Sequence, residues 1–435
     1  MDTLFDLIQR KNELPKGNIY KKQIKNNSYF YHQYRENGKN YSIKIKEEQV
    51  EPLRKQIEER EDIERKIKEL LKGGNKEIEL SESAKNYTGY VMSGNIVTAE
   101  FDKGTLVSPI HNLCPLVIKS TMSLFQFLKS RCIDGGRTNS RLLKKALNIN
   151  VKDESLISLC SYAASISDNY WFKPKHSKLK YEDVSFNNDI FFDTALRGII
   201  SIYPKRLVLT PELTTNGSYE KGWRNINGEW WLYKVGTKNE RYSEVFCSRL
   251  FEKLGLPTAH YEIEGNYIKT KNFASDVNFE PMVSLVGDNE DIEFIYDALN
   301  KINHKLALDY LRLISFDVIL NNVDRHNENC GIIRDRKTGN IISLAPNYDD
   351  NLCLISRSTT LIATIQEGFL SLFLKTLRNS KEIKEGLREI IFPSITMDLL
   401  KSIHEEIGIE VDIDFDSIGK YILFRYNTIQ KEINK

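Results

Sequence analysis

Hydrophobic and polar residues alternate over three short segments near the start of the chain, at residues 18–24, 28–35 and 39–46. Alternation with a period of two is typical of strands that have one exposed face. Asn37-Gly38 separates the second segment from the third, and this dipeptide favours a tight hairpin turn. A charged segment with helical spacing follows at residues 47–71 and ends before a Gly-Gly pair. The pattern predicts a three-stranded meander followed by one helix.

The next part of the chain, residues 76–200, changes character. It begins with a strand pair at residues 89–92 and 96–101 and continues with mainly helical spacing of its apolar positions. We therefore expect a helical accessory region there.

The second half of the chain moves from strands to helices. Strands are predicted at residues 230–235, 259–264 and 267–271, with an amphipathic helix at 240–254. Residues beyond 285 are helical apart from a loop-and-strand segment near 321–350. We therefore expect an α+β protein. Its predicted domains are the meander and helix (1–75), the accessory domain (76–200), a strand-rich lobe (201–285) and a helical lobe (286–435).

Composition excludes several classes of protein. The chain has 435 residues, with 62 Lys and Arg against 60 Asp and Glu, so its net charge is only +2. No apolar run approaches the ~18 residues of a membrane helix, and the first residues are unlike a signal or transit peptide. Six cysteines occur without a C-x-x-C spacing. We expect a cytoplasmic protein with free, mostly buried thiols.

Basic charge is nevertheless concentrated locally. Between residues 10 and 46 there are ten basic residues, two acidic residues and six aromatic residues. A basic meander followed by a helix resembles the arm-type DNA-binding modules of tyrosine recombinases, and the alternative is a dimerisation or partner-docking arm. A second basic cluster comprises Arg131, Arg137 and Arg141 around two glycines. It predicts a surface turn or, alternatively, a contact with nucleic acid or a phosphoprotein.

The clearest chemical signal is the segment D-R-H-N-E-N at residues 324–329. It follows a predicted helix, and a hairpin then leads to L-A-P-N-Y-D at residues 344–349. Phosphoryl transfer needs a carboxylate to accept the proton of the attacking hydroxyl, and oxygen ligands to hold Mg²⁺. Asp324, Asn329 and Asp349 have this chemistry and order. The alternative is a polar surface loop whose Asp and Asn side chains cap turns.

A kinase also needs a cation to hold the nucleotide phosphates. Lys234 lies at the end of a predicted strand, and Glu244 lies ten residues later on the predicted helix, an order that suits a Lys–Glu pair. Upstream, Gly217 and Gly222 belong to a loop whose backbone could approach phosphate. No Walker motif, G-x-S-x-G or H-E-x-x-H sequence occurs. The alternatives are solvated charges and an ordinary surface hairpin.

Together these residues resemble the HipA-type serine/threonine kinases, over about residues 200–435. The resemblance rests on N-G-S-Y-E-K (216–221), Lys234, Glu244 and the two motifs that contain Asp324 and Asp349. It implies a bilobal protein-kinase-like fold with a mostly helical C-terminal lobe.

The resemblance also implies roles for individual residues. Asp324 would be the catalytic base, and Asn329 and Asp349 would bind Mg²⁺. The ATP-binding set would be Lys234, Glu244, Gly217, Ser218, Lys221, Lys271 and Phe273. Ser218, in the phosphate loop, would be the candidate autophosphorylation site, with Thr214 and Thr215 as lesser candidates. Residues 271–273 would form the hinge.

The resulting hypothesis is a bacterial-like, ATP- and Mg²⁺-dependent serine/threonine protein kinase of HipA type, related to toxin–antitoxin systems. Its substrate would be a protein, such as a translation component, and an antitoxin-like or DNA partner would bind through residues 10–46. Two rivals remain. One is a small-molecule or lipid kinase of related fold, and the other is a DNA-binding regulator with a kinase-like scaffold.

Overall fold

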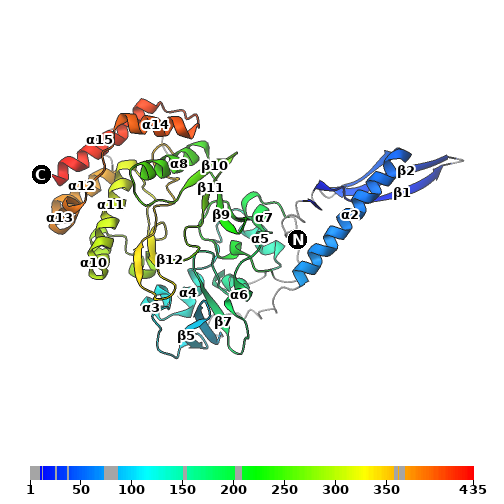
Figure 1. Ribbon diagram of the computed structural model, residues 1–435, viewed down its shortest axis with the longest axis horizontal. Coiled ribbons are helices and arrows are strands. Elements are labelled where there is room, and N and C mark those ends of the chain that lie inside the picture. Colours follow the sequence, from blue (N-terminus) through cyan, green and yellow to red (C-terminus); the bar gives the residue numbers. More distant parts are fainter. Residues whose placement is uncertain are drawn as a thin grey trace.

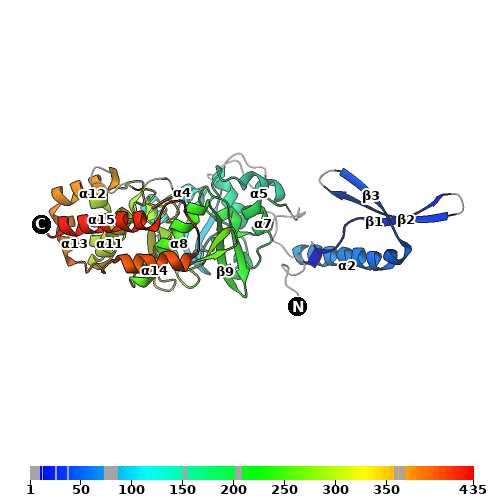
Figure 2. The same cartoon turned by 90° about the horizontal axis from the view of Figure 1, so that it is seen from above.

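The computed structural model describes residues 10–11, 13–24, 27–36, 39–72, 87–149, 154–200, 208–356, 361 and 368–435. These residues form four small antiparallel sheets and a set of helices, which confirms the predicted α+β class. Both views show the C-terminal helices, coloured yellow to red, at one end of the molecule, and the N-terminal meander with its long helix, coloured blue, at the other (Figures 1 and 2). None of the described helices is long and apolar enough to cross a membrane.

The N-terminal module has the predicted meander and helix. Its strands are β1 (Asn18–Ile24), β2 (Asn27–Glu36) and β3 (Lys39–Ile45), paired in sequence order, and the helix is α2 (Glu47–Lys72). The predicted glycine stop at residues 73–74 and the Asn-Gly turn at 37–38 lie outside the described residues.

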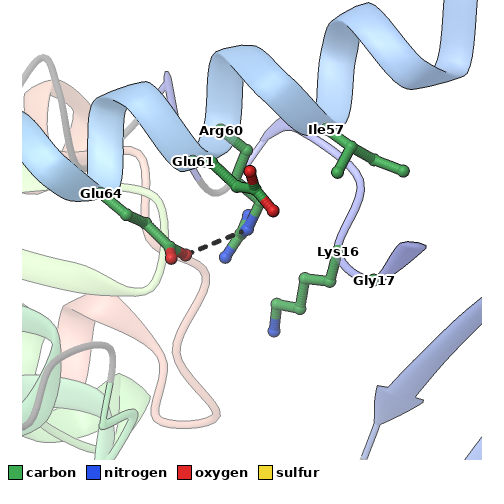
Figure 3. A pocket seen from close by; sticks show the side chains of 6 residues that line it. All are labelled: Lys16, Gly17, Ile57, Arg60, Glu61 and Glu64. Carbon is green, nitrogen blue, oxygen red and sulfur yellow. Dashed lines mark ion pairs between the residues drawn. The ribbon is translucent and has the colours of Figure 1, made fainter.

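A buried arginine of α2 fixes the chain that leads into β1. Arg60 donates from Nη1 to the carbonyl oxygen of Leu14 at 2.9 Å and also to that of Lys11, and its Nε lies 3.3 Å from Glu64. A polar pocket of about 260 Å³ opens beside it; Figure 3 shows the lining side chains of α2 facing Lys16 and Gly17. Leu14 also joins an apolar cluster with residues of the next region.

The second region is built on a four-stranded sheet with the order β6-β5-β4-β7. It contains the predicted strand pair and two further short strands that the pattern did not show. The strands are β4 (Gly89–Ser93), β5 (Ile96–Asp102), β6 (Thr105–Leu106) and β7 (Tyr170–Pro174). The helices are α3 (Leu116–Thr121), α4 (Leu124–Lys129), α5 (Ser140–Ala146), the 3₁₀ helix η2 (Glu154–Ser161), α6 (Tyr181–Val184) and α7 (Phe192–Arg197).

The third sheet carries the predicted lysine. Its order is β10-β11-β9-β8, and α8 packs against β10 and β11. The elements are η3 (Pro211–Thr214), β8 (Lys221–Ile226), β9 (Glu229–Val235), α8 (Lys238–Lys253), β10 (Tyr261–Glu264) and β11 (Tyr267–Lys271). Asn227 and Gly228 join β8 to β9 with φ of 53° and 88°, so this turn is of the type that suits a twisted hairpin. Thr237 and Glu240 form a capping box that fixes the start of α8.

The last region surrounds a small sheet with helices. The sheet is β12 (Asn278–Pro281), β13 (Gly331–Arg334) and β14 (Ile341–Leu344). The helices are α9 (Val283–Val286), α10 (Ile292–Ile302), α11 (His304–Leu320), α12 (Gly368–Asn379), α13 (Lys381–Glu389), α14 (Met397–Ile407) and α15 (Phe415–Ile433). The largest apolar cluster joins α8, α11 and α15 with β13. The segment with the predicted catalytic residues therefore leaves the buried helix α11 and enters a buried strand.

All six cysteines are buried and unpaired, as expected for a reduced protein. The thiols of Cys247 on α8 and Cys353 are neighbours, with their sulfur atoms 3.1 Å apart.

Substitution of Gly331 tests whether β12 and β13 need a residue without a side chain where they pack closely. A Cβ atom there would overlap the carbonyl oxygen of Glu280 and lie 2.6 Å from the ring of Phe279. We expect Gly331→Ala to lower the free energy of unfolding by about 1–3 kcal/mol, measured by urea denaturation, because overpacking displaces neighbours.

Gly368→Ala is the control, because Gly368 begins α12 and nothing lies within 4 Å of the added Cβ. This variant should be as stable as the wild type or slightly more stable. If both glycine variants unfolded at the same urea concentration as the wild type, close strand packing at Gly331 would be refuted.

Candidate active site

The D-R-H-N-E-N segment forms a tight loop between α11 and β13. The loop begins at Asn321, which ends α11 in the left-handed conformation with φ of 54°. Asn329 donates from Nδ2 to the carbonyl oxygen of Asp324 at 3.1 Å, so the two ends of the loop are held together. This bond uses the amide nitrogen of Asn329, and the side-chain oxygen is the atom left for a ligand.

Arg325 joins this loop to the segment that carries Asp349. Its guanidinium is only 3% exposed and forms a double ion pair with Asp317 of α11, with two contacts of 2.9 Å. It also contacts Asp350 at 2.7 Å and donates to the carbonyl oxygen of Tyr348 at 2.8 Å. A further bond reaches the carbonyl oxygen of Asn329. One side chain therefore fixes α11, the loop of residues 324–329 and the residues on both sides of Asp349.

Amide side chains complete this buried network. Asn322 donates from Nδ2 to both Asp317 and Asp350, at 3.0 and 2.9 Å. Asn347 donates to the other oxygen of Asp350 at 2.5 Å. Burial raises the pKa of Asp350 to about 6, although Arg325 opposes the shift. The network thus stabilises two carboxylates that would be costly to bury alone.

Asp349 lies beside the predicted phosphate-binding lysine. Its Oδ1 is 2.7 Å from Nζ of Lys234, and its backbone has a φ of 64°, which few residues other than glycine adopt. Burial alone would raise the pKa of Asp349, but Lys234 and Lys221 hold it below its usual range. Asp349 is therefore charged at neutral pH and can act as an oxygen ligand for a hard cation.

Lys234 also contacts Glu244, as the sequence pattern predicted. Nζ of Lys234 lies 2.8 Å from Oε1 of Glu244, which is fully buried on α8, and 3.2 Å from the hydroxyl of Tyr261. Burial would lower the pKa of Lys234, but Asp349 and Glu244 raise it well above its usual value. The lysine thus stays protonated and links the sheet, α8 and Asp349. Sequence reasoning missed Tyr261, because a tyrosine on a strand gives no signal of its own.

The predicted phosphate loop closes over a second lysine. Gly217 has a φ of 101°, and a Cβ atom there would collide with Nζ of Lys221. Lys221 faces Lys234 across the β8–β9 pair, and burial lowers its pKa to about 8. The loop is also tied to α8, because the hydroxyl of Tyr219 donates to Glu240 at 3.0 Å. The buried side chains of Lys221 and Lys234 therefore lie together beside Asp349. Gly217, which has no side chain, lets the loop backbone come close to Lys221.

The three hydroxyl candidates of this loop differ in exposure. Ser218 is exposed, whereas Thr214 and Thr215 are buried. Both threonine hydroxyls donate to the carbonyl oxygen of Pro211, and that of Thr215 also accepts a bond from the indole of Trp223 at 3.0 Å. Of the three, Ser218 is the side chain open to modification.

The Arg-rich turn is only partly the surface feature that the sequence predicted, because Gly135, Gly136 and Arg141 are exposed whereas Arg137 is buried. Arg137 is 1% exposed, donates to the carbonyl oxygen of Lys221 and lies 3.5 Å from the fully buried Glu212. Arg131 pairs with Asp168 at 2.6 Å. For Arg137, the prediction of a surface position and the alternative of a contact with nucleic acid or a phosphoprotein are therefore both wrong. Its guanidinium instead contacts Glu212 and the first residue of β8.

The two predicted hinge residues occupy different surroundings. Lys271 is exposed and pairs with Glu229 at the far end of β9. Phe273 lies closer to the site, since its ring centroid is 5.9 Å from that of Tyr348, the neighbour of Asp349. The structure thus brings Phe273 beside the Asp349 segment and leaves Lys271 outside the contacts of Lys234.

The oxygen atoms of Asn329 and Asp349 fit the ligand chemistry of Mg²⁺. Among the described residues, no group of three or more His, Cys, Asp or Glu side chains could hold a metal ion by itself. A magnesium site that uses one carboxylate, one amide oxygen and substrate phosphates does not need such a group. The residues present are therefore compatible with a magnesium ion that arrives with a nucleotide.

Arg325 offers a test of the buried network that depends on pH. Arg325→Met leaves the carboxylates of Asp317 and Asp350 without their cation, and should lower the free energy of unfolding by about 3–5 kcal/mol near pH 8. The pKa of Asp350 is already raised, and loss of Arg325 raises it further. A carboxyl whose pKa is higher in the folded chain favours folding as pH falls. The deficit relative to wild type should therefore be smaller at pH 5 than at pH 8 in thermal unfolding.

Arg312→Met is the matched control, because Arg312 lies on α11, the helix that carries Asp317, and pairs with a partly exposed Asp309 at 2.9 Å. It should change stability by no more than about 1 kcal/mol at either pH. A deficit for Arg325→Met that did not depend on pH, or that was no larger than this control, would contradict the proposed role of the network.

Comparisons with known proteins agree with the family predicted from the sequence. Residues 204–400 match the family model of the HipA-like C-terminal domain. Among solved structures, the Helicobacter pylori proinflammatory kinase CtkA is similar with a TM-score of 0.42 and 19% identity, over 49% of this chain and 92% of that chain. HipA of Shewanella oneidensis MR-1, solved with HipB and its operator DNA, gives a TM-score of 0.46 and 13% identity, over 80% of this chain and 97% of that chain. A search of curated proteins found no match. Residues 204–400 of this chain are therefore similar to the HipA-like C-terminal domain.

Proposed function

We propose that this chain is an ATP- and Mg²⁺-dependent kinase that transfers the γ-phosphate to a serine or threonine hydroxyl of a protein. One observation carries the proposal. Lys234 is buried and contacts both Glu244 and Asp349, and Arg325 ties the Asp349 segment to the loop of Asp324 and Asn329. Segments far apart in the sequence thus meet in one connected site, which supports Lys234 as the phosphate-binding cation, Asp349 as a metal ligand and Asp324 as the base.

Each residue of the site has one role in this proposal. Asp324 orients the attacking hydroxyl and accepts its proton. Asn329 and Asp349 provide oxygen ligands for the metal, and the low pKa of Asp349 keeps its carboxylate charged. When bound, Mg²⁺ and ATP supply charge neutralisation and the transferable phosphoryl group.

The two lysines would hold phosphate in different ways. Lys234 is protonated over the whole physiological range, because two carboxylates raise its pKa. Lys221 has a pKa of about 8, so part of the population is neutral at slightly alkaline pH. An anionic phosphate beside Lys221 would restore its charge, since a nearby negative charge favours the protonated form. Glu244 would position Lys234 from α8.

The biological setting remains part of the proposal. It comprises a protein substrate, a relation to toxin–antitoxin systems and an antitoxin-like or DNA partner for residues 10–46. Incubation with a bacterial extract and labelled ATP separates the proposed activity from a small-molecule or lipid kinase. A labelled protein band supports a protein kinase, whereas label found only in small molecules contradicts it.

The catalytic roles can be tested by intact mass after incubation with ATP and Mg²⁺. Wild-type protein should gain one or more phosphates. Asp324→Asn and Asp349→Asn should each reduce the rate by at least about 10²-fold, because they remove the base and a metal ligand.

Asp309→Asn is the control, because Asp309 lies on α11 outside the site and pairs with exposed Lys305. It should gain phosphate at the wild-type rate. An Asp324→Asn protein that gained phosphate as fast as the wild type would refute the proposed base. If even the wild type gained nothing and ATP did not raise its melting temperature, the kinase proposal itself would fail.

Exposure predicts where such a phosphate would be found. We expect peptide mapping to place it on Ser218, and we expect Ser218→Ala to abolish the mass gain, since Thr214 and Thr215 are buried. Ser402→Ala, which removes an exposed hydroxyl on α14, should leave the gain unchanged. An undiminished gain in Ser218→Ala would show that the modified hydroxyl lies elsewhere.

A further inference from the structure

The three-stranded sheet of the N-terminal module has two chemically different faces. Residues that pair directly across antiparallel strands project on the same side, so the register assigns every position to a face. One face, here called the isoleucine face, comprises Ile19, Lys21, Gln23, Ser28, Phe30, His32, Tyr34, Tyr41, Ile43 and Ile45. The other, here called the tyrosine face, comprises the positions of Asn18, Tyr20, Lys22, Ile24, Asn27, Tyr29, Tyr31, Gln33, Arg35, Asn40, Ser42 and Lys44.

The tyrosine face is cationic, and the one aliphatic residue that the register assigns to it is Ile24, the last residue of β1. Lys22, Arg35 and Lys44 are all exposed, and no acidic residue shares their face. Within the part of the chain whose side chains are described, none of these three cations forms an ion pair. The neighbouring Arg10 behaves differently, because it pairs with Glu59 of α2 at 2.8 Å. The face therefore presents positive charge that the module does not neutralise.

The aromatic side chains of this face are already held in place. The rings of Tyr20 and Tyr31 stack with centroids 5.4 Å apart, and the hydroxyl of Tyr20 lies 2.9 Å from that of Ser42. Nζ of Lys44 sits 3.9 Å above the ring of Tyr29. Because the ring faces are engaged with one another or with a cation, they are poorly placed to stack on the bases of a single strand. Their hydroxyl groups remain suited to phosphate contacts.

The size and chemistry of the face match double-stranded DNA. Three strands spaced about 4.8 Å apart give a surface about 10 Å wide, which fits a major groove about 12 Å wide. Lysine, arginine, tyrosine and serine side chains bind phosphates, while asparagine, glutamine and arginine read base edges. A protein-docking face would instead need an apolar centre, and the one aliphatic position of the tyrosine face, Ile24, lies at the end of β1 rather than at the centre.

We propose that the tyrosine face of β1–β3 binds duplex DNA. Figures 1 and 2 show these strands at the end of the molecule away from the helices α11–α15, so a duplex on this face need not approach Asp324. The proposal does not depend on the kinase reaction, because none of its residues belongs to the candidate active site.

The test uses the full chain and a fluorescently labelled 20-base-pair duplex of mixed sequence, with fluorescence anisotropy measured between 50 and 200 mM KCl. Three cations that neutralise phosphates predict a slope of log affinity against log salt of about −3. Lys22→Gln/Arg35→Gln/Lys44→Gln should weaken binding at least tenfold at 100 mM salt and should remove most of this slope.

The matched control carries the same change in net charge away from the tyrosine face. Lys21→Gln/Lys55→Gln/Lys66→Gln alters the isoleucine face and the exposed side of α2, and should bind within twofold of the wild type. Circular dichroism checks that both triple variants keep their secondary structure. Equal losses in the two variants would show that general charge, rather than this face, attracts DNA and would overturn the proposal.

Two further outcomes would also overturn it. Tighter binding of the single-stranded form of the same oligonucleotide would mean that unpaired bases are the ligand. Absence of duplex binding at 50 mM salt, together with binding of an acidic protein, would make the face a docking surface for protein. Asp324→Asn should bind the duplex as the wild type does, so a failure of the DNA proposal and a failure of the kinase proposal give different results.

Discussion

The candidate site depends on one buried cation. Arg325 is the point at which α11, the loop of Asp324 and the segment of Asp349 meet, and each connection is a charged or backbone hydrogen bond in a nearly dry environment. Buried ion pairs add little net stability when they replace apolar contacts, but they are costly to break and their geometry is narrowly defined. The main effect of Arg325 is therefore to hold these three segments in fixed positions, rather than to raise the free energy of unfolding. A site whose parts come from separate segments needs such a constraint.

Much of the site could be predicted from the sequence because its residues lie close together along the chain. Asp324 and Asn329 are the two ends of one loop, and Lys234 and Glu244 belong to a strand and the helix that follows it. The meander of β1–β3 could be predicted for the same reason, since the alternation of hydrophobic and polar residues and the residues of tight turns are local signals. The family match over residues 204–400 agrees with these local motifs. The roles of the residues remain predictions that only activity can test.

The features that the sequence did not show depend on distant partners. Three consecutive aromatic residues of β7, Tyr170, Trp171 and Phe172, are all buried, so the strand lacks the alternation that marks one exposed face. Arg137 looked like a surface charge because arginine is mostly exposed, and its burial depends on Glu212 and on a carbonyl of β8. Arg325 lay inside a recognised motif, but its function requires Asp317 and Asp350 around it. In each case the deciding contact is long-range.

Among the residues that the structure describes, some cations are buried and paired with carboxylates, whereas others are exposed and unpaired. The first kind belongs to the proposed kinase site and the second to the proposed DNA-binding face. Lys221 and Lys234 are buried beside carboxylates, where salt screens their interactions weakly and geometry decides what they bind. Lys22 and Arg35 are exposed and unneutralised by their own module, so their attraction for a polyanion is long-range and falls steeply with salt. With a net charge of only +2, the molecule as a whole attracts neither nucleotide nor duplex. Selectivity for each must come from where the cations sit and what surrounds them.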